Sequence, residues 1–302
     1  MDHRGSSKEI GWKTSSKMGV VAAGGAEAVA AGMAMLEQGG NAADAAAATL
    51  LALMVTDHGE CSIGGEVPLL IYDAKRQEVK ALSGMGSAPL SQDAIAWYMK
   101  NGIPEAGNIK IAPVPSVVDL CLTTLKVYGT KSYAEVVAPT LALLDAGQED
   151  WHPRLAVTLR KMVAEEAASP GSREEKIQAA CDLFYGRGGT PSSIADDLEA
   201  FYIEKGGFLR KADLAAHVTR IEEPVSVQYH GYTVYKCGTW TQGPVLCQAL
   251  LLLDVCDLKS MGFLSGDYTH SVVEALKLAF ADRDQYYGDP NFVKVPLAEL
   301  LS

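Results

Sequence analysis

Apolar residues at helical spacing mark the segment from 267 to 292. The residues of this apolar face are Tyr268, Val272, Val273, Leu276, Ala279 and Phe280. Because residues three and four positions apart share one side of an α-helix, the pattern predicts a helix that lays this face on a core. Ser265 or Asp267 can cap its start. Gly288 with Pro290 predicts its end.

The last turns of this helix carry more polar and aromatic groups than a solvated end requires. They are Asp282, Arg283, Asp284, Tyr286 and Tyr287. This density indicates a helix end that packs against another part of the protein, and a charged surface end is the alternative. Asp282, Asp284 and Asp289 could form a cation site. Arg283 lies among them, however, and favours a charge network.

The same periodicities predict further elements. Helices are expected at residues 26–38, 93–101, 116–128, 132–146, 193–204 and 242–255. Another helix can be capped by Asn41, and from Ala45 onward it is apolar on all sides, which predicts a buried position. Hairpins are expected at 67–73 with 78–83 and at 225–229 with 232–236. A short strand, or the approach to one, is expected at 19–23, and the pattern is broken at 169–193. Two isolated hairpins are marginally stable, so they must join a larger sheet that this sequence lacks.

The composition narrows the class of protein. The chain has 302 residues, 48% of them hydrophobic, which is enough for one large domain or two small ones. A net charge of −11 leaves no basic patch to neutralise phosphates, so nucleic acid is not an expected partner. The six cysteines lie far apart, without CxxC or Cys/His metal spacing, which indicates reduced thiols and no metal site.

The beginning of the chain bears on its location. Residues 1–17 form a polar tail without the apolar stretch of a signal peptide. The longest apolar run, residues 45–55, is too short to cross a bilayer, so no membrane partner is expected. The expected location is the cytoplasm, or the periplasm if a leader has been removed.

Four stretches in order resemble the γ-glutamyltranspeptidase family. They lie at residues 36–89, 114–147, 231–254 and 274–292, and the last contains FADRDQYYGDPNF. The resemblance covers nearly everything from Val20 to Ser302. It implies an α/β chain of the α+β type, mostly helical with two hairpins, which a small subunit completes into the four-layer αββα sandwich of an N-terminal-nucleophile hydrolase.

The resemblance also implies how the chemistry is divided. Members of this family are made as one precursor that cuts itself in two, and a Thr exposed at the start of the small subunit attacks the amide. Its free α-amine can act as the base. Residues 18–302 are then the large subunit, a single domain with no catalytic residue of its own, no cofactor and no activity alone. The expected partners are the small subunit and a small amide substrate, and a dimer of such heterodimers is left open.

One departure from the family pattern bears on the substrate. The family carries an Arg in an R-E-x-A-P stretch after the first hairpin, where it binds the α-carboxylate of the γ-glutamyl group. Here the stretch is Met85-Gly86-Ser87-Ala88-Pro89, and no Arg lies between residues 77 and 98. A thioether cannot pair with a carboxylate. We therefore expect other amides as substrates, with Met85, Gly86 and Ser87 at the site, helped by Ser83. An ordinary turn after the hairpin is the alternative.

A second departure lies at residues 238–244, where the family has a Pro-rich Ser-Gly stretch. Trp240 and Gln242 could line a substrate pocket there, or the loop could pack against the small subunit. Two other clusters are weaker candidates for a functional site. His58 with Cys61 suggests a nucleophile pair, but neighbours in sequence rarely adopt that geometry. Residues 62–65 lack the Lys and the spacing of a phosphate loop, which favours a tight turn.

These observations favour an amidohydrolase or acyltransferase subunit. True γ-glutamyl transfer, with an Arg from elsewhere in the chain, is the alternative within enzymes. A non-catalytic relative that serves as a binding or scaffold protein is the alternative of another class.

Overall fold

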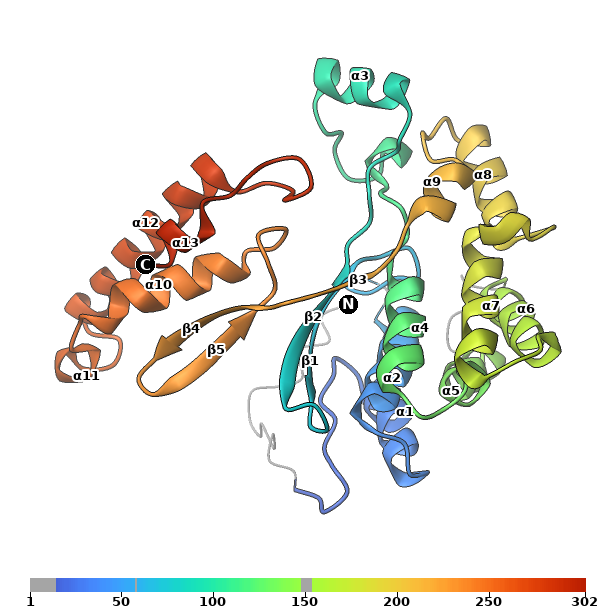
Figure 1. Cartoon of the computed structure of the whole chain (residues 1–302), viewed down its shortest axis with the longest axis horizontal. Coiled ribbons are helices and arrows are strands. Elements are labelled where there is room, and N and C mark those ends of the chain that lie inside the picture. Colours follow the sequence, from blue (N-terminus) through green and yellow to red (C-terminus); the bar gives the residue numbers. More distant parts are fainter. Residues whose placement is uncertain (1–14, 58, 148–153) are drawn as a thin grey trace. The chain divides into compact units, whose positions relative to one another are not determined.

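The computed structural model describes residues 15–57, 59–147 and 154–302. The predicted tail at 1–17 therefore lies mostly outside the described residues, as does His58. The chain divides into two compact units (Figure 1). Unit 1 comprises residues 1–63 and 121–215, and unit 2 comprises residues 64–120 and 216–302. The expectation that residues 18–302 form a single domain, the large subunit of a heterodimer, stays a prediction.

Helices make up most of the chain. Unit 1 holds α1 (Ala26–Glu37), α2 (Ala42–Thr56), α5 (Tyr133–Asp145), α6 (Leu155–Ala168), α7 (Arg173–Tyr185), the short η2 (Arg187–Gly189) and α8 (Ile194–Glu204). Unit 2 holds α3 (Gln92–Asn101), η1 (Ile109–Ile111), α10 (Gly243–Asp254), α11 (Leu258–Met261), α12 (Gly266–Tyr286) and α13 (Leu297–Leu300). The helices α4 (Val117–Tyr128) and α9 (Lys211–Ala216) cross from one unit into the other.

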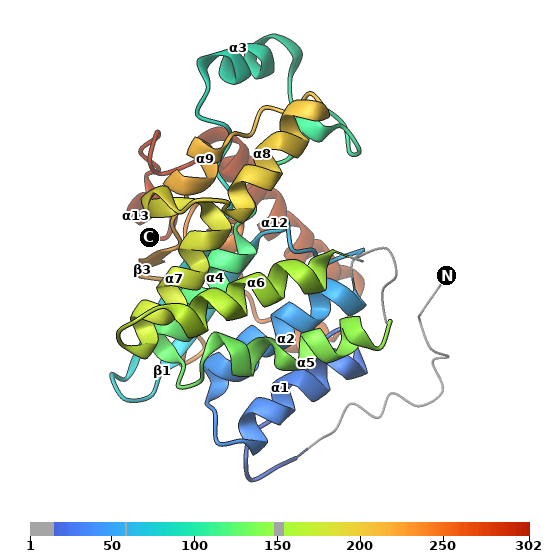
Figure 2. The same cartoon turned by 90° about the vertical axis from the view of Figure 1, so that its right-hand side faces the viewer.

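Unit 1 is built around α2. Asn41 caps this helix as predicted, because its side chain accepts from the backbone N–H groups of Ala43 and Asp44. Most of its residues are buried on every side, which confirms the prediction of a core helix. α1 and α5 pack on α2, and α6 and α7 follow beyond α5 (Figure 2).

Unit 2 contains two small antiparallel sheets. β1 (Val67–Asp73) and β2 (Glu78–Gly84) form the first predicted hairpin, and β3 (Arg220–Glu222) adds a third strand that the sequence did not reveal. β4 (Val225–Tyr229) and β5 (Tyr232–Lys236) form the second predicted hairpin. His230 and Gly231 turn it with φ of 48° and 83°, the positive values that a two-residue hairpin turn requires.

α10 and α12 form the helical part of unit 2. Val245 and Ala249 of α10 meet Ala279 of α12, and Leu276 and Tyr287 pack against them. Ser265 caps α12 as predicted, since its hydroxyl accepts from the N–H of Tyr268 at 3.1 Å. Only part of the predicted apolar face is buried, because Val273 and Phe280 remain exposed.

Two predictions from the sequence are wrong in detail. Residues 19–23 contain no strand, and the predicted break at 169–193 contains all of α7. The predicted end of the helix before Gly288 and Pro290 is confirmed, since α12 ends at Tyr286 and the chain is extended at Tyr287 (φ −79°, ψ 148°). All six cysteines are free thiols, and four of them are buried. In the described ranges, no helix combines the length and the apolar character needed to cross a bilayer.

Candidate functional site

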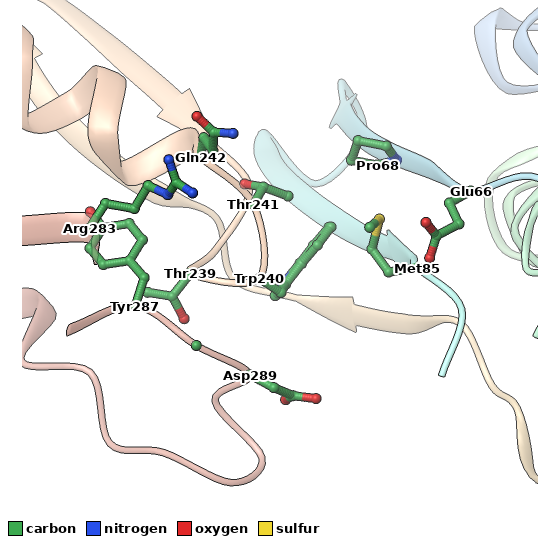
Figure 3. Close-up of a pocket in the computed structure, with 11 residues that line it drawn as sticks. Glu66, Pro68, Met85, Thr239, Trp240, Thr241, Gln242, Arg283, Tyr287 and Asp289 are labelled. Atoms are coloured by element: carbon green, nitrogen blue, oxygen red, sulfur yellow. The ribbon is translucent and has the colours of Figure 1, made fainter. Parts of the chain in front are cut away.

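A pocket of about 690 Å³ lies within unit 2 (Figure 3). Its lining residues are Glu66, Pro68, Met85, Thr239, Trp240, Thr241, Gln242, Arg283, Tyr287, Gly288 and Asp289. They come from the start of β1, the residue after β2, the loop between β5 and α10, and the end of α12. Figure 3 shows Glu66, Pro68 and Met85 on one side of Trp240, and Arg283 and Tyr287 on the other.

Met85 is held in place by its neighbour Gly86. The Gly86 N–H donates to Oε1 of Glu66 at 2.6 Å. A Cβ at Gly86 would lie 2.0 Å from the carbonyl oxygen of Val114, so only glycine allows this close approach. The carbonyl of Ser87 accepts from the N–H of Val114 at 3.0 Å. These contacts fix the backbone beyond β2 and leave the Met85 side chain in the pocket.

The loop between β5 and α10 supplies the middle of the pocket. The indole N–H of Trp240 donates to Oε2 of Glu222 at 2.8 Å, which sets the orientation of the ring. The Thr241 hydroxyl donates to the carbonyl of Gly238 at 2.9 Å and accepts from the N–H of Gly243 at 2.9 Å. A Cβ at Gly243 would lie 2.4 Å from the carbonyl oxygen of Cys237, so the tight entry into α10 requires a glycine.

The end of α12 supplies the third side. The Arg283 guanidinium carbon lies 5.4 Å from the centre of the Phe280 ring, and its Nε lies 3.6 Å from Oδ1 of Asp284. The Asp289 carboxylate accepts from the N–H and the side-chain amide of Asn291 at 2.9 Å and 2.7 Å.

Tyr287 lines the pocket at the point where α12 meets α10. Burial raises the pKa of its phenol, and the nearby Cys247 and Asp282 raise it further. The phenol therefore stays neutral at physiological pH.

The predicted site residues are only partly brought together. Met85, Trp240 and Gln242 line the same pocket. Gly86 and Ser87 are not among its lining residues. The Gly86 N–H donates to Glu66, and the Ser87 side chain is exposed. Ser83, expected to help at the site, is instead buried within β2.

Sequence reasoning missed several lining residues. These are Glu66, Pro68, Thr239, Thr241, Tyr287, Gly288 and Asp289, with Arg283 considered only as part of a charge network. Nothing local in the sequence joins residue 66 to residue 283, because their meeting depends on the packing of unit 2. The one local indication is the dense group of polar and aromatic residues at the end of α12, which predicts that this helix end packs against another part of the protein.

The pocket is lined by side chains of both charges as well as by hydroxyl and apolar groups. Among its lining residues, all within the described part of the chain, Arg283 is the one cation, against the carboxylates of Glu66 and Asp289. An adjoining hollow of about 380 Å³ shares Pro68, Thr241 and Gln242 with it, and Lys236 lines that hollow. The hydroxyls of the pocket have no histidine, lysine or thiol among the same lining residues to activate them. Across residues 15–57, 59–147 and 154–302, no group of three or more His, Cys, Asp or Glu side chains could hold a metal ion.

Comparison with known proteins identifies the family. The family model for gamma-glutamyltranspeptidase matches residues 28–174 and 151–302. A glutathione hydrolase proenzyme from Pseudomonas sp. strain A14 is 30% identical over 296 residues, covering 89% of this chain and 51% of that protein. An acylase ACY 1 proenzyme from Pseudomonas sp. strain SE83 is 30% identical over 320 residues, covering 95% of this chain and 57% of that protein.

The solved structures agree on the fold. A chain of the Helicobacter pylori gamma-glutamyltranspeptidase crystal structure superposes with a TM-score of 0.78 at 26% identity, covering 96% of this chain and 90% of that one. This confirms the expected fold class, mostly helical with small antiparallel sheets. The chain spans about half the length of the curated relatives that it matches. With nearly all of its residues matched by the family model, the chain belongs to the gamma-glutamyltranspeptidase family.

Proposed function

We propose that this chain is the large subunit of an amide hydrolase or acyltransferase, which acts together with a second subunit cut from the same precursor. The relatives are named proenzymes, and this chain covers about half of each of them. It covers 90% of the matched chain in the H. pylori structure. These proportions support a division of the enzyme into two parts.

The pocket supports a role in binding the substrate rather than in nucleophilic attack on the amide. The observation that carries the proposal is that the pocket holds an apolar wall, hydroxyls and charges but no activated nucleophile among its lining residues. A Thr at the start of the second subunit would supply the nucleophile and its own amine as the base. The role of this chain is then to hold the acyl part of the amide.

The acyl group is proposed to differ from the γ-glutamyl group. Met85 stands where the family resemblance places the carboxylate-binding Arg, and it lines the pocket. The Glu66 carboxylate lines the same side (Figure 3). A substrate carboxylate placed there would meet a thioether and a negative charge instead of a guanidinium, which opposes binding.

The test of this proposal is a comparison of substrates on the processed two-subunit protein. We expect simple acyl anilides to be hydrolysed faster than a γ-glutamyl anilide. Replacement of the first residue of the second subunit by Ala should abolish both activities. Equal or faster turnover of the γ-glutamyl anilide would contradict the substrate assignment. A second subunit that begins with a residue other than Thr, Ser or Cys would contradict the mechanism.

Met85→Arg in a Glu66→Gln background tests whether residue 85 lies at the acyl site. The double change restores a guanidinium and removes the opposing carboxylate. We expect the KM for the γ-glutamyl anilide to fall about tenfold, as one charge-assisted hydrogen bond allows. Glu66→Gln alone is the matched control. An unchanged KM in the double variant would mean that this part of the pocket does not receive the substrate.

The alternative of γ-glutamyl transfer keeps one observation in its favour. It requires an Arg from elsewhere in the chain, and Arg283 lines the same pocket as Met85. The substrate comparison decides between the two functions.

A further inference from the structure

One glutamate outside the pocket holds the ring at its centre. The indole N–H of Trp240 donates to Oε2 of Glu222 at 2.8 Å, yet Glu222 is not among the residues that line the pocket. It belongs to β3, where its backbone lies opposite Ala81 of β2. Because β2 leads directly to Met85, the strand ladder fixes Glu222 relative to the Met85 side of the pocket. The position of Trp240 is therefore tied to that of Met85 through β3.

The Glu222 carboxylate is itself held through both oxygens. Its Oε1 lies 3.0 Å from Nε of Arg220, which is two positions earlier on β3 and so on the same face of the strand. Nη1 of Arg220 donates to Oδ1 of Asn291 at 2.7 Å, and Asn291 donates to the pocket-lining carboxylate of Asp289. Charge-assisted hydrogen bonds of this kind are about twice as strong as neutral ones. β3 thus connects the end of β2, the loop between β5 and α10, and the segment after α12.

Trp240 needs such an anchor because its loop fixes the backbone and not the ring. The N–H of Thr241 donates to the carbonyl of Gly238 at 2.9 Å and closes the turn. This bond does not restrict the two side-chain torsions of Trp240. The ring lies close to Gly238, where an added Cβ would be 3.2 Å from Nε1 of Trp240. The bond to Glu222 therefore decides which way the indole points.

The fixed ring divides the pocket. Figure 3 shows Met85 and Glu66 on one side of Trp240, and Arg283 and Tyr287 on the other. A group that enters beside Met85 meets the indole before it can reach the α12 side. Such a group can use only part of the total volume of about 690 Å³ while the ring is held. If the ring is released, the two parts of the pocket join and a longer group can extend toward α12.

We propose that Glu222 is a positioning residue, which acts through Trp240 to limit the length of the acyl group that the pocket accepts. The substrate class is an amide of a short acyl group, held beside Met85 and stopped by the indole ring. This assignment rests on the proposed amide hydrolase function and adds the size of its acyl group.

The test measures chain-length preference on the processed two-subunit protein. The substrates are the anilides of butyric and octanoic acids, and the measured quantity is the ratio of kcat/KM for the octanoyl to that for the butyryl anilide. In Glu222→Ala this ratio should rise about 5- to 20-fold over the wild type, mainly through a lower KM for the octanoyl anilide. Glu222→Gln keeps one acceptor oxygen, which can serve the indole or Arg220 but not both, and should raise the ratio less. An equal loss of activity toward both anilides would mean that Glu222 only supports the fold, and would overturn the assignment.

Two further variants test whether Glu222 acts through Trp240. Glu223→Ala is the matched control, since Glu223 is the next residue, pairs with Lys80 of β2 and does not line the pocket, so the ratio should stay unchanged. Trp240→Phe removes the indole N–H and should raise the ratio by itself. Glu222→Ala added to Trp240→Phe should change the ratio by less than about twofold, because the carboxylate then has no indole to hold. Additive effects of the two changes, or an equal rise in Glu223→Ala, would overturn the assignment.

Two measurements without turnover separate this proposal from the proposed function. In protein labelled with ¹⁵N-tryptophan, the indole N–H signal that is lost in Trp240→Phe should shift in Glu222→Ala and stay in place in Glu223→Ala. Calorimetry should show that Glu222→Ala binds octanamide more tightly relative to butyramide than the wild type does. These two results would support the positioning role even if no anilide is hydrolysed, an outcome that would refute the amidase function alone. Hydrolysis with the same chain-length preference in wild type and Glu222→Ala would support the amidase function and overturn the positioning role, as would an unchanged indole signal.

Discussion

A single buried carboxylate organises one corner of unit 1. Asp44 is fully buried in the first turn of α2, and its oxygens accept from the N–H of Asn41 at 2.8 Å, from the N–H and hydroxyl of Thr130 at 2.8 Å each, and from the N–H of Lys131 at 3.0 Å. One side chain therefore caps α2 and also holds the turn after α4, 86 residues further along the chain. The helix N-terminus adds a favourable dipole.

Asp44→Asn should destabilise the protein by about 2–4 kcal/mol, because an amide nitrogen would face backbone donors that it cannot satisfy. Urea unfolding of wild type and variant, followed by circular dichroism, measures the difference. Asp196→Asn is the control, since Asp196 forms a similar capping box with Ser193 but lies at the surface. A change at Asp44 no larger than that at Asp196 would show that the buried bonds carry no special weight.

The same carboxylate predicts how stability depends on pH. Burial alone would raise the pKa of Asp44, but the hydrogen bonds from Asn41, Lys131 and Thr130 outweigh it and hold the pKa below its ordinary value. A folded pKa below the unfolded one contributes stability at neutral pH, and this contribution is lost as the pH falls through the acid range below about 5. Wild type should lose stability more steeply than Asp44→Asn between pH 5 and pH 3. Parallel pH profiles would contradict the depressed pKa.

At the scale of elements, α7 is joined to the end of α4 by one arginine. Nη1 of Arg173 donates to the carbonyls of Leu125 and Lys131 at 3.1 Å and 2.8 Å. Nη2 donates to the carbonyls of Lys126 and Gly129, both at 3.1 Å. These are carbonyls of the last turn of α4 and of the segment after it, where a helix leaves carbonyls without partners, although the Leu125 carbonyl also accepts from the N–H of Gly129 at 2.9 Å. Two elements are thus connected through backbone groups.

Arg173→Lys should be nearly as destabilising as Arg173→Met, because a single ammonium cannot serve four carbonyls at once. We expect a loss of about 1.5–3 kcal/mol for either change, and faster hydrogen exchange at residues 125–131. Arg160→Met is the matched control, since Arg160 pairs with Asp145 at the surface and should contribute less than about 1 kcal/mol. Full rescue by Lys would show that charge, rather than the fork, holds the two helices together.

The elements also show what local pattern could and could not predict. The helix capped by Asn41 and both hairpins follow from cap residues, turn residues and alternation, and the structure confirms them. The sequence analysis gives a break in the pattern where α7 lies, although Ser172 and Glu175 form the capping box that starts this helix. β3 is three residues long and exists only by pairing with β2, so no local pattern could reveal it.

For the pocket as well, local sequence pattern predicts some of the side chains and cannot predict those that tertiary packing brings together. Met85, Trp240 and Gln242 were found because they depart from a family pattern, whereas Arg283 fits the resemblance and drew no attention as a binding group. Its position opposite Glu66 depends on how α12 packs within unit 2. Tertiary packing therefore decides the charge distribution of the site, and short-range sequence pattern does not encode it.

At the scale of the whole molecule, unit 2 leaves much apolar surface open. Val255, Phe263 and Phe292 are exposed by 89%, 81% and 86%. The β4–β5 sheet has two strands, too few for independent stability in water. Exposed large apolar side chains, and a sheet with open edges, are each typical of a surface that another chain covers. This supports the second subunit of the proposed function as the covering partner.

The chain purified without its second subunit should therefore associate or remain loosely packed in unit 2. We expect broad, concentration-dependent elution in size-exclusion chromatography and rapid hydrogen exchange at β4 and β5, because their backbone hydrogen bonds then have little cover. The amides of α2 are the internal control and should stay protected with or without the partner, since that helix is buried within unit 1. Addition of the second subunit should protect β4 and β5 and give one discrete species. A compact monomer whose β4 and β5 amides are as protected as those of α2 would mean that this chain needs no partner to complete its fold.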